Sequence, residues 1–204
     1  MDNELKRSVD YSRKRLQAIR NCESKVSDIL WKSTQKIIAA SKRYRGAGRL
    51  TNESALLSYA KNVTAEAEDS INRYISAYSK ASCKILGIDS ENIESFLVSD
   101  IYGKTTSERN AVYLGNFAED IVRMIKAGTL MRYSDQQILS SIRTGYKDPY
   151  HTSVITKAKR KDINIDVPSY GKGYYKNAYQ NIVRNASQVI ALAWGQAEQE
   201  YGHE

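Results

Sequence analysis

Apolar residues recur at helical spacing through the first forty residues of the chain. Polar and basic residues, as in the stretch SRKRLQAIR, fill the positions between them. This period predicts one long helix from about residue 3 to residue 43. The apolar stripe is narrow and is interrupted by Ser12, Glu23 and Ser33, which favours packing against one partner helix over burial in a large core. The stripe consists of Leu5, Val9, Leu16, Ile19, Val26, Leu30 and Ile37.

A second long helix is predicted after a glycine-containing break, RYRGAGRLTNES. Gly46 and Gly48 permit a turn there, and Thr51 or Asn52 can cap the helix that follows. Helical spacing then continues to Gly87, a typical helix end. Two long helices joined by a short turn are expected to form an antiparallel hairpin. The apolar stripe of the second helix consists of Leu56, Tyr59, Val63, Ala67, Ile71, Tyr74, Tyr78, Ala81 and Ile85.

Capping residues indicate where the next helices begin. Asp89 or Ser90 can cap a short helix in DSENIESFLVSDIYG. Thr105 and Glu108 have the spacing of a capping box, in which each side chain bonds to the backbone N–H of the other residue. The helix that follows has an apolar face and a plausible end at Gly128. Its apolar residues are Val112, Phe117, Ile121, Val122 and Ile125.

The remaining third of the chain combines helical and irregular patterns. Ser134 and Gln137 form a second capping box, at the start of SDQQILSSIRTG. Residues 145–172 then lose helical periodicity and include both prolines, a KAKRK cluster and the string INIDV. A loop of this length inside a compact domain is usually functional. A last helix is predicted from about Gly173 to Gly202.

Together these patterns predict an all-α fold. It comprises a long N-terminal helical hairpin and a smaller helical bundle with one long irregular basic loop. We divide the chain into a basic N-terminal helical arm at 1–50, a helical core at 51–145, an extended interaction loop at 146–172, and a C-terminal helix at 173–204 that packs on the core.

The positive charge is concentrated at the N-terminal end. Residues 1–50 contain 13 Lys/Arg and 5 Asp/Glu, a net charge of +8, whereas residues 51–204 contain 18 of each. Such an arm suits a polyanion or an acidic protein surface, and the alternative is the solvated face of an amphipathic helix. Its candidate docking residues are Arg13, Lys14, Arg15, Leu16, Ile19 and Arg20.

No constellation of catalytic or metal-binding residues stands out. The chain has two histidines and lacks HExxH, CxxC and phosphate-loop motifs. We therefore expect no enzyme, no metal and no cofactor. Cys22 and Cys83 are interpreted as reduced, buried thiols of a cytosolic product. The polar N-terminus predicts no secretory signal, and no apolar run is long enough to span a bilayer.

A second basic region surrounds the irregular loop. Residues 143–184 contain 9 Lys/Arg and 3 Asp/Glu, interleaved with tyrosines. This composition suits phosphate contact with base stacking, or a protein interface, and the alternative is that the tyrosines are half-buried in a helical core. The candidate partner-binding residues are Tyr150, Lys157, Lys159, Arg160, Lys161, Tyr170, Tyr174, Tyr175 and Tyr179.

From about Ile101 to Gly202 the order of these elements resembles the head morphogenesis, or minor head protein, family of tailed phages (Mu F-like). The resemblance lies in the order and spacing of short motifs. They are GKTTSER at 103–109, IKAGTLMRYSDQQILSSI after it, Asp148 with Pro149, then Gly171, Gly173, Tyr175, Tyr179, Asn181 and Arg184, and finally Ala193 with Trp194. The chain departs from the family in its last helix, where Ser187, Gln188 and Val189 replace the usual Arg-Thr-Glu triplet.

The resemblance implies a structural virion protein at the portal vertex of a tailed bacteriophage. Such a protein would bind the portal protein and neighbouring connector or head subunits, act in head assembly and DNA packaging or delivery, and form a homo-oligomer around the portal. It would be found in the virion, and in the host cytoplasm during assembly, with DNA contact through the basic arm and no membrane contact. One alternative is a head-to-tail connector or adaptor ring protein. The alternative from another class is a basic helical nucleic-acid-binding protein.

Overall fold

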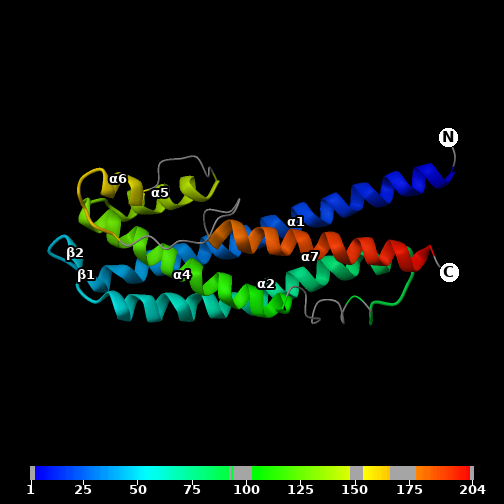
Figure 1. The fold of residues 1–204 in the computed structure, drawn as a ribbon, viewed down its shortest axis with the longest axis horizontal. Coiled ribbons are helices and arrows are strands. Elements are labelled where there is room, and N and C mark those ends of the chain that lie inside the picture. The colour runs from blue at the N-terminus through cyan, green and yellow to red at the C-terminus, as the bar shows by residue number, and fades with distance from the viewer. Residues whose placement is uncertain (1–2, 92, 94–102, 148–153, 166–177, 203–204) are drawn as a thin grey trace. The chain divides into compact units, whose positions relative to one another are not determined.

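The computed structural model of the chain describes residues 3–91, 93, 103–147, 154–165 and 178–202. Within them it forms six α-helices and one two-stranded sheet (Figure 1), which confirms the all-α prediction. The helices are α1 (Asn3–Ser41), α2 (Glu53–Leu86), α4 (Thr106–Leu130), α5 (Asp135–Lys147), α6 (Val154–Lys159) and α7 (Ala178–Tyr201); a 3-10 turn (Lys42–Tyr44) precedes strands β1 (Arg45–Gly46) and β2 (Arg49–Leu50).

The chain folds into two compact units, each assembled from segments that lie far apart in the sequence. Unit 1 contains Met1–Asp28, Asp69–Asn110 and Ile182–Glu204, and unit 2 contains Ile29–Glu68 and Ala111–Asn181. Helices α1, α2, α4 and α7 each contribute residues to both units. The division into consecutive segments at 1–50, 51–145, 146–172 and 173–204 stays a prediction.

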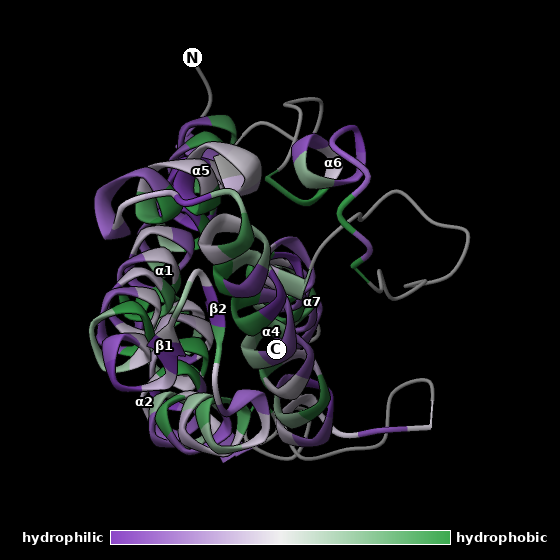
Figure 2. Cartoon of the chain, turned by 90° about the vertical axis from the view of Figure 1, so that its left-hand side faces the viewer, coloured by the Kyte–Doolittle hydropathy of each residue, from purple (hydrophilic) through white to green (hydrophobic). Residues whose placement is uncertain are grey.

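Alternating hydrophobic and hydrophilic residues along the long helices account for the two cores (Figure 2). Unit 1 buries Trp194 with aliphatic side chains of α1, α2 and α7. Unit 2 buries Phe117 with aliphatic side chains of α1, α2, α4 and α5. The fully or almost fully buried aliphatic residues are Val26, Ile71, Ile75, Val189 and Ile190 in unit 1, and Leu30, Ile37, Leu56, Ile121, Ile125, Ile138 and Ile142 in unit 2.

The predicted apolar stripe of α1 is correct in one half of the helix and wrong in the other. Val26, Leu30 and Ile37 are fully buried. Towards the N-terminus, however, the buried side chains are Tyr11, Ala18 and Cys22, whereas Leu5, Val9 and Leu16 are exposed. Small or partly polar side chains line the buried face there, so the larger aliphatic residues of the outer face dominated the sequence pattern.

A tight hairpin connects α1 to α2, as the two glycines predicted. Strands β1 and β2 are antiparallel, with Arg45 opposite Leu50 and Gly46 opposite Arg49. The two loop residues, Ala47 and Gly48, have φ of 50° and 76°. Positive φ at both positions is the geometry of a type I′ turn, which matches the twist of the strands.

The predicted N-terminal caps of α2, α4 and α5 are present. Asn52 Oδ1 accepts a hydrogen bond from Ala55 N at 3.0 Å. In the capping box of α4, Thr105 N donates to Glu108 Oε2 at 2.7 Å and Glu108 N donates to Thr105 Oγ1 at 3.1 Å. In that of α5, Ser134 N donates to Gln137 Oε1 at 2.8 Å and Gln137 N donates to Ser134 Oγ at 3.2 Å. Short-range hydrogen bonds therefore set these helix starts.

Helix α4 ends after Gly128, not at it. Tyr133 N donates to Gly128 O at 2.8 Å and Arg132 N donates to Thr129 O at 3.0 Å, the hydrogen-bond pair of a Schellman motif. The left-handed residue of this motif is Arg132, with φ 58°. Gly128 is needed for packing instead: a Cβ there would lie 2.5 Å from Ile138 Cγ1 of α5.

The predicted irregular loop is partly helical. Helix α5 extends to Lys147, and Val154–Lys159 form α6, whose Val154 and Ala158 are buried. Burial of these two side chains offsets the cost of ordering a short helix that the sequence period did not reveal. Residues 148–153 and 166–177, together with most of the predicted short helix after Ser90, lie outside the described residues. The last predicted helix is described from Ala178, whose N–H donates to Asp120 Oδ2 at 3.3 Å.

Candidate functional site

The N-terminal half of α1 carries an exposed apolar ridge, which we define as Leu5, Val9 and Leu16. These side chains are 55%, 58% and 56% exposed. Residues four and seven positions apart lie on one side of a helix, so the three side chains form one line. Large aliphatic side chains grouped on one helix face are typical of a contact surface.

Cations border this ridge. Lys6 and Arg13 lie three residues before and four residues after Val9, and Arg20 lies four residues after Leu16. All three are exposed, and none has a hydrogen bond or ion pair with any residue that the structure describes. An apolar line beside unpaired positive charges suits an acidic, partly apolar partner.

The other predicted arm residues divide between the solvent and the interior of unit 1. Arg13, Lys14 and Arg20 are exposed, whereas Arg15 and Ile19 are half-buried. Arg15 Nη2 donates to Ala191 O at 2.9 Å, so this guanidinium group holds α1 against α7. Arg15 therefore acts in the fold of the arm, and Leu16 remains a candidate for contact.

An aromatic contact fixes the buried side of the arm. Tyr11 Oη donates to Trp194 O at 2.8 Å, and the two rings lie 5.1 Å apart. Trp194 is 1% exposed, and its Nε1 donates to Tyr78 O at 2.9 Å. Helices α1, α2 and α7 are thus connected through one indole, which leaves the ridge of α1 on the outside.

Side-chain amides connect three helices of unit 1 next to the GKTTSER motif. Asn110 Nδ2 donates to Asn72 Oδ1 at 2.7 Å, and Asn185 Nδ2 donates to Asn110 Oδ1 at 2.8 Å. Arg109 Nε donates to Asn185 Oδ1 at 3.0 Å. The residues Thr105, Glu108 and Arg109 of the motif therefore begin α4 and attach it to α7.

Ser187, Gln188 and Val189 of α7 have different surroundings. Ser187 Oγ donates to Glu23 Oε1 of α1 and contacts Val183 O at 3.1 Å. Gln188 is exposed and Val189 is buried. Ser187 thus supplies a polar contact between α1 and α7.

The structure separates the predicted loop residues. Lys157 is half-buried, and Lys159, Arg160 and Lys161 are exposed on and just after α6. Tyr179 is half-buried and stacks on Tyr146 with ring centroids 4.8 Å apart, while Tyr146 contacts Phe117 at 5.6 Å. This stack gives Tyr179 a place in the core of unit 2, and its partner-binding role stays a prediction. Tyr150, Tyr170, Tyr174 and Tyr175 lie outside the described residues.

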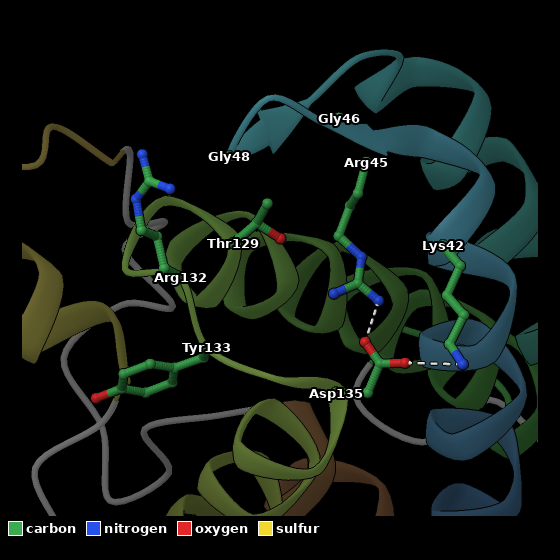
Figure 3. Close-up of a pocket in the computed structure, with 8 residues that line it drawn as sticks. All are labelled: Lys42, Arg45, Gly46, Gly48, Thr129, Arg132, Tyr133 and Asp135. Atoms are coloured by element: carbon green, nitrogen blue, oxygen red, sulfur yellow. Dashed lines mark hydrogen bonds and ion pairs between the residues drawn. The ribbon is translucent and has the colours of Figure 1, made fainter.

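A basic hollow in unit 2 is the feature that sequence reasoning missed. It has a volume of about 410 Å³ and lies between the β1–β2 hairpin and the α4–α5 connection (Figure 3). Arg132 rises from that connection towards Gly48, and Arg45 reaches from the hairpin to Asp135 (Figure 3). The lining residues are Lys42, Arg45, Gly46, Gly48, Thr129, Arg132, Tyr133 and Asp135.

One carboxylate is shared by two of the cations in the hollow. Arg45 Nη2 bonds to Asp135 Oδ1, and Lys42 Nζ lies 3.3 Å from Asp135 Oδ2. Burial alone would raise the pKa of Asp135, but the hydrogen bonds and charges of Arg45 and Lys42 outweigh it and lower this pKa. Asp135 is therefore an anion at neutral pH.

The described residues show neither a metal cluster nor a membrane span. No group of three or more His, Cys, Asp or Glu side chains is placed to hold a metal ion within them. None of the described helices combines the length and the apolar character needed to cross a bilayer. Cys22 and Cys83 are both buried free thiols.

Comparison with known proteins finds no counterpart: no family model, no curated protein and no solved structure matches this chain.

Proposed function

We propose that this chain is a non-enzymatic structural protein that docks on an acidic partner through helix α1. The observation that carries the proposal is the apolar ridge of Leu5, Val9 and Leu16 beside Lys6, Arg13 and Arg20. Tyr11 and Trp194 hold the opposite side of α1, so the ridge faces outward on an ordered helix. Burying the ridge would supply affinity, and the cations would supply specificity and speed of association.

The more specific proposal places this partner at the portal vertex of a tailed-phage particle. It rests on the ordered motifs from Gly103 to Trp194. In this role the chain would bind the portal protein as a minor head protein and act in head assembly and DNA packaging or delivery. A connector or adaptor ring protein would use the same ridge to bind the same partner. The location of this protein in purified particles would distinguish a minor head protein from a connector or adaptor.

The first prediction is that the ridge is required for incorporation into particles. Val9→Asp combined with Leu16→Asp should lower the amount of this protein in purified particles by about tenfold or more, since two aliphatic contacts are lost and charges of the wrong sign are added. The measurement is quantitative mass spectrometry of the particles, with co-purification of the portal protein.

The matched control is Gln17→Asp combined with Asn21→Asp. Both positions are exposed on the same helix but away from the ridge, and the double variant has the same change of charge. It should be incorporated like the unchanged protein, and both variants should keep their helicity. Absence of the unchanged protein from particles would refute the portal proposal. Equal incorporation of the two variants would refute the proposal that the ridge is the docking surface. The nucleic-acid-binding alternative would be favoured if the free protein bound duplex DNA in a salt-dependent way and if removal of the cations beside the ridge, with the ridge itself unchanged, abolished that binding.

A further inference from the structure

We propose that the basic hollow of unit 2 binds the phosphate group of a small molecule. The site is separate from the ridge of α1 and does not depend on the function proposed above. Three cations, Lys42, Arg45 and Arg132, surround it, and Asp135 is the one carboxylate in its lining. The lining therefore has a net charge of +2, which matches the dianionic form of a phosphate monoester.

Arg132 is the cation that is available for a ligand. Its guanidinium group has no hydrogen bond or ion pair with any described residue. It lies close to the hairpin, because a Cβ placed on Gly48 would be 4.0 Å from both Arg132 Cζ and Arg132 Nη2. The guanidinium group of Arg132 therefore lies beside the hairpin at the rim of the hollow, and such a fork can hold two phosphate oxygens at once.

The residue at position 132 also has a backbone conformation that arginine does not favour. Its φ of 58° is the left-handed position at the end of α4, where glycine is the usual residue. Non-glycine residues persist in this conformation at a cost, and such positions are enriched at ligand-binding sites.

Arg45, which also lines the hollow, has a donor without a hydrogen-bond partner among the described residues. Its side chain is 14% exposed, and its Nε is buried without a hydrogen-bond partner among the described residues. The other end of the guanidinium group is held by Asp135. The Asp135 carboxylate already occupies the position of an anion, so an incoming phosphate would compete with it for Arg45 and Lys42.

The shape of the hollow favours a small ligand over duplex DNA. The cations gather around one concavity of about 410 Å³ and do not follow a line along a helix or groove. Contact with a duplex backbone needs cations distributed along successive phosphates. The expected ligand therefore presents one phosphate group. It is either inorganic phosphate or a small molecule that carries a phosphate, such as a phosphorylated amino acid.

Two substitutions should act in opposite directions. Arg132→Gly removes one cation and relieves the left-handed backbone, so the protein should stay folded while phosphate binding weakens by about tenfold. Asp135→Asn removes the competing carboxylate, so phosphate binding should tighten several-fold. The matched control is Lys32→Gln, which removes one exposed positive charge from unit 2 outside the hollow and should leave binding unchanged.

The experiment is titration of the full-length protein with inorganic phosphate, phosphoserine and a short DNA duplex, followed by calorimetry and by amide NMR. Saturable shifts at Arg132 and Gly48, with the three variant effects above, would establish the site. Tighter binding of phosphoserine than of inorganic phosphate would identify a monoester as the ligand, and tighter binding of inorganic phosphate would identify free phosphate.

Three outcomes would overturn the proposal. They are no binding of either phosphate probe up to about 10 mM, equal binding by the unchanged protein and Arg132→Gly, or DNA binding through Arg132 without binding of phosphoserine. The ridge variant Val9→Asp/Leu16→Asp should bind phosphate normally. The phosphate-binding proposal and the docking proposal can therefore be refuted independently of each other.

Discussion

Gly128 shows how one missing side chain allows two helices to pack. A Cβ at this position would lie 2.5 Å from Ile138 Cγ1 and 3.0 Å from Ile138 Cδ1. Real Cβ atoms do not approach carbon so closely, so the α4–α5 contact requires glycine here or a shift of Ile138. Gly115 of the same helix has no atom within 4 Å of the corresponding position.

Gly128→Ala should destabilise the protein by about 1–2 kcal/mol. Overpacking typically costs about 1–3 kcal/mol, and alanine recovers roughly 0.5–1 kcal/mol through its greater helix propensity. Gly115→Ala is the matched control and should stabilise by roughly 0.5–1 kcal/mol. Urea unfolding measures both free energies. Ile138→Ala removes both Cγ1 and Cδ1, so combining it with Gly128→Ala should cost less than the two single changes together, and strict additivity would contradict the clash.

At the scale of elements, the side-chain amides of Asn72, Asn110 and Asn185 connect α2, α4 and α7. Asn110 is fully buried and Asn185 is 5% exposed. Asn110 stands in the middle, since it donates to Asn72 and accepts from Asn185. Removing the middle member therefore takes a hydrogen-bond partner from the buried amide N–H of Asn185 and from the half-buried amide oxygen of Asn72. A buried polar group left without a partner costs about 1–3 kcal/mol.

Asn110→Ala should lower the free energy of unfolding by about 2 kcal/mol or more. Asn21→Ala, at an exposed position of α1, is the control and should change stability by less than about 0.5 kcal/mol. Chemical denaturation gives both values. Amide hydrogen exchange should also show loss of protection at the start of α4 and in the middle of α7. A variant as stable as the unchanged protein would show that the amides exchange these hydrogen bonds for water without cost.

At the scale of the whole molecule, two buried titratable groups of α1 contribute to the dependence of stability on alkaline pH. Burial raises the pKa of Cys22 to about 12, and the charge of Glu23 acts in the same direction. Burial and the charge of Glu198 raise the pKa of Tyr11 to about 12, against the opposing charge of Arg15. Both groups ionise more readily in the unfolded chain, so their stabilisation is complete below the unfolded pKa and is lost as pH rises towards 12.

Stability should therefore fall steeply between about pH 9 and about pH 12. Cys22 alone should contribute a slope of about 1.4 kcal/mol per pH unit over that interval, because the folded thiol stays protonated while the unfolded one ionises. Urea unfolding at about pH 8 and about pH 10.5 measures the slope. Cys22→Ala should reduce it, while lowering stability at neutral pH. An unchanged slope in this variant would show that other groups cause the loss of stability at alkaline pH.

Local sequence signals predicted where α2, α4 and α5 begin and where the chain turns before α2. The capping boxes at Thr105 and Ser134, the cap at Asn52 and the turn at Gly46–Gly48 are all present. These features depend on hydrogen bonds between residues three or fewer positions apart and on backbone conformations that glycine permits. Because no residues far away in the sequence take part in these features, the amino-acid sequence alone was sufficient to predict them.

Tertiary structure decided which faces of the helices are buried and which charges meet. Leu5, Val9 and Leu16 carry the stronger hydrophobic signal in α1, yet Tyr11 is buried because Trp194 packs on its side. The hollow brings residues 42–48 beside residues 129–135, which are far apart in sequence and have no motif in common. Their proximity results from packing of α4 and α5 next to the hairpin. No local pattern encodes a contact between side chains that only folding brings together.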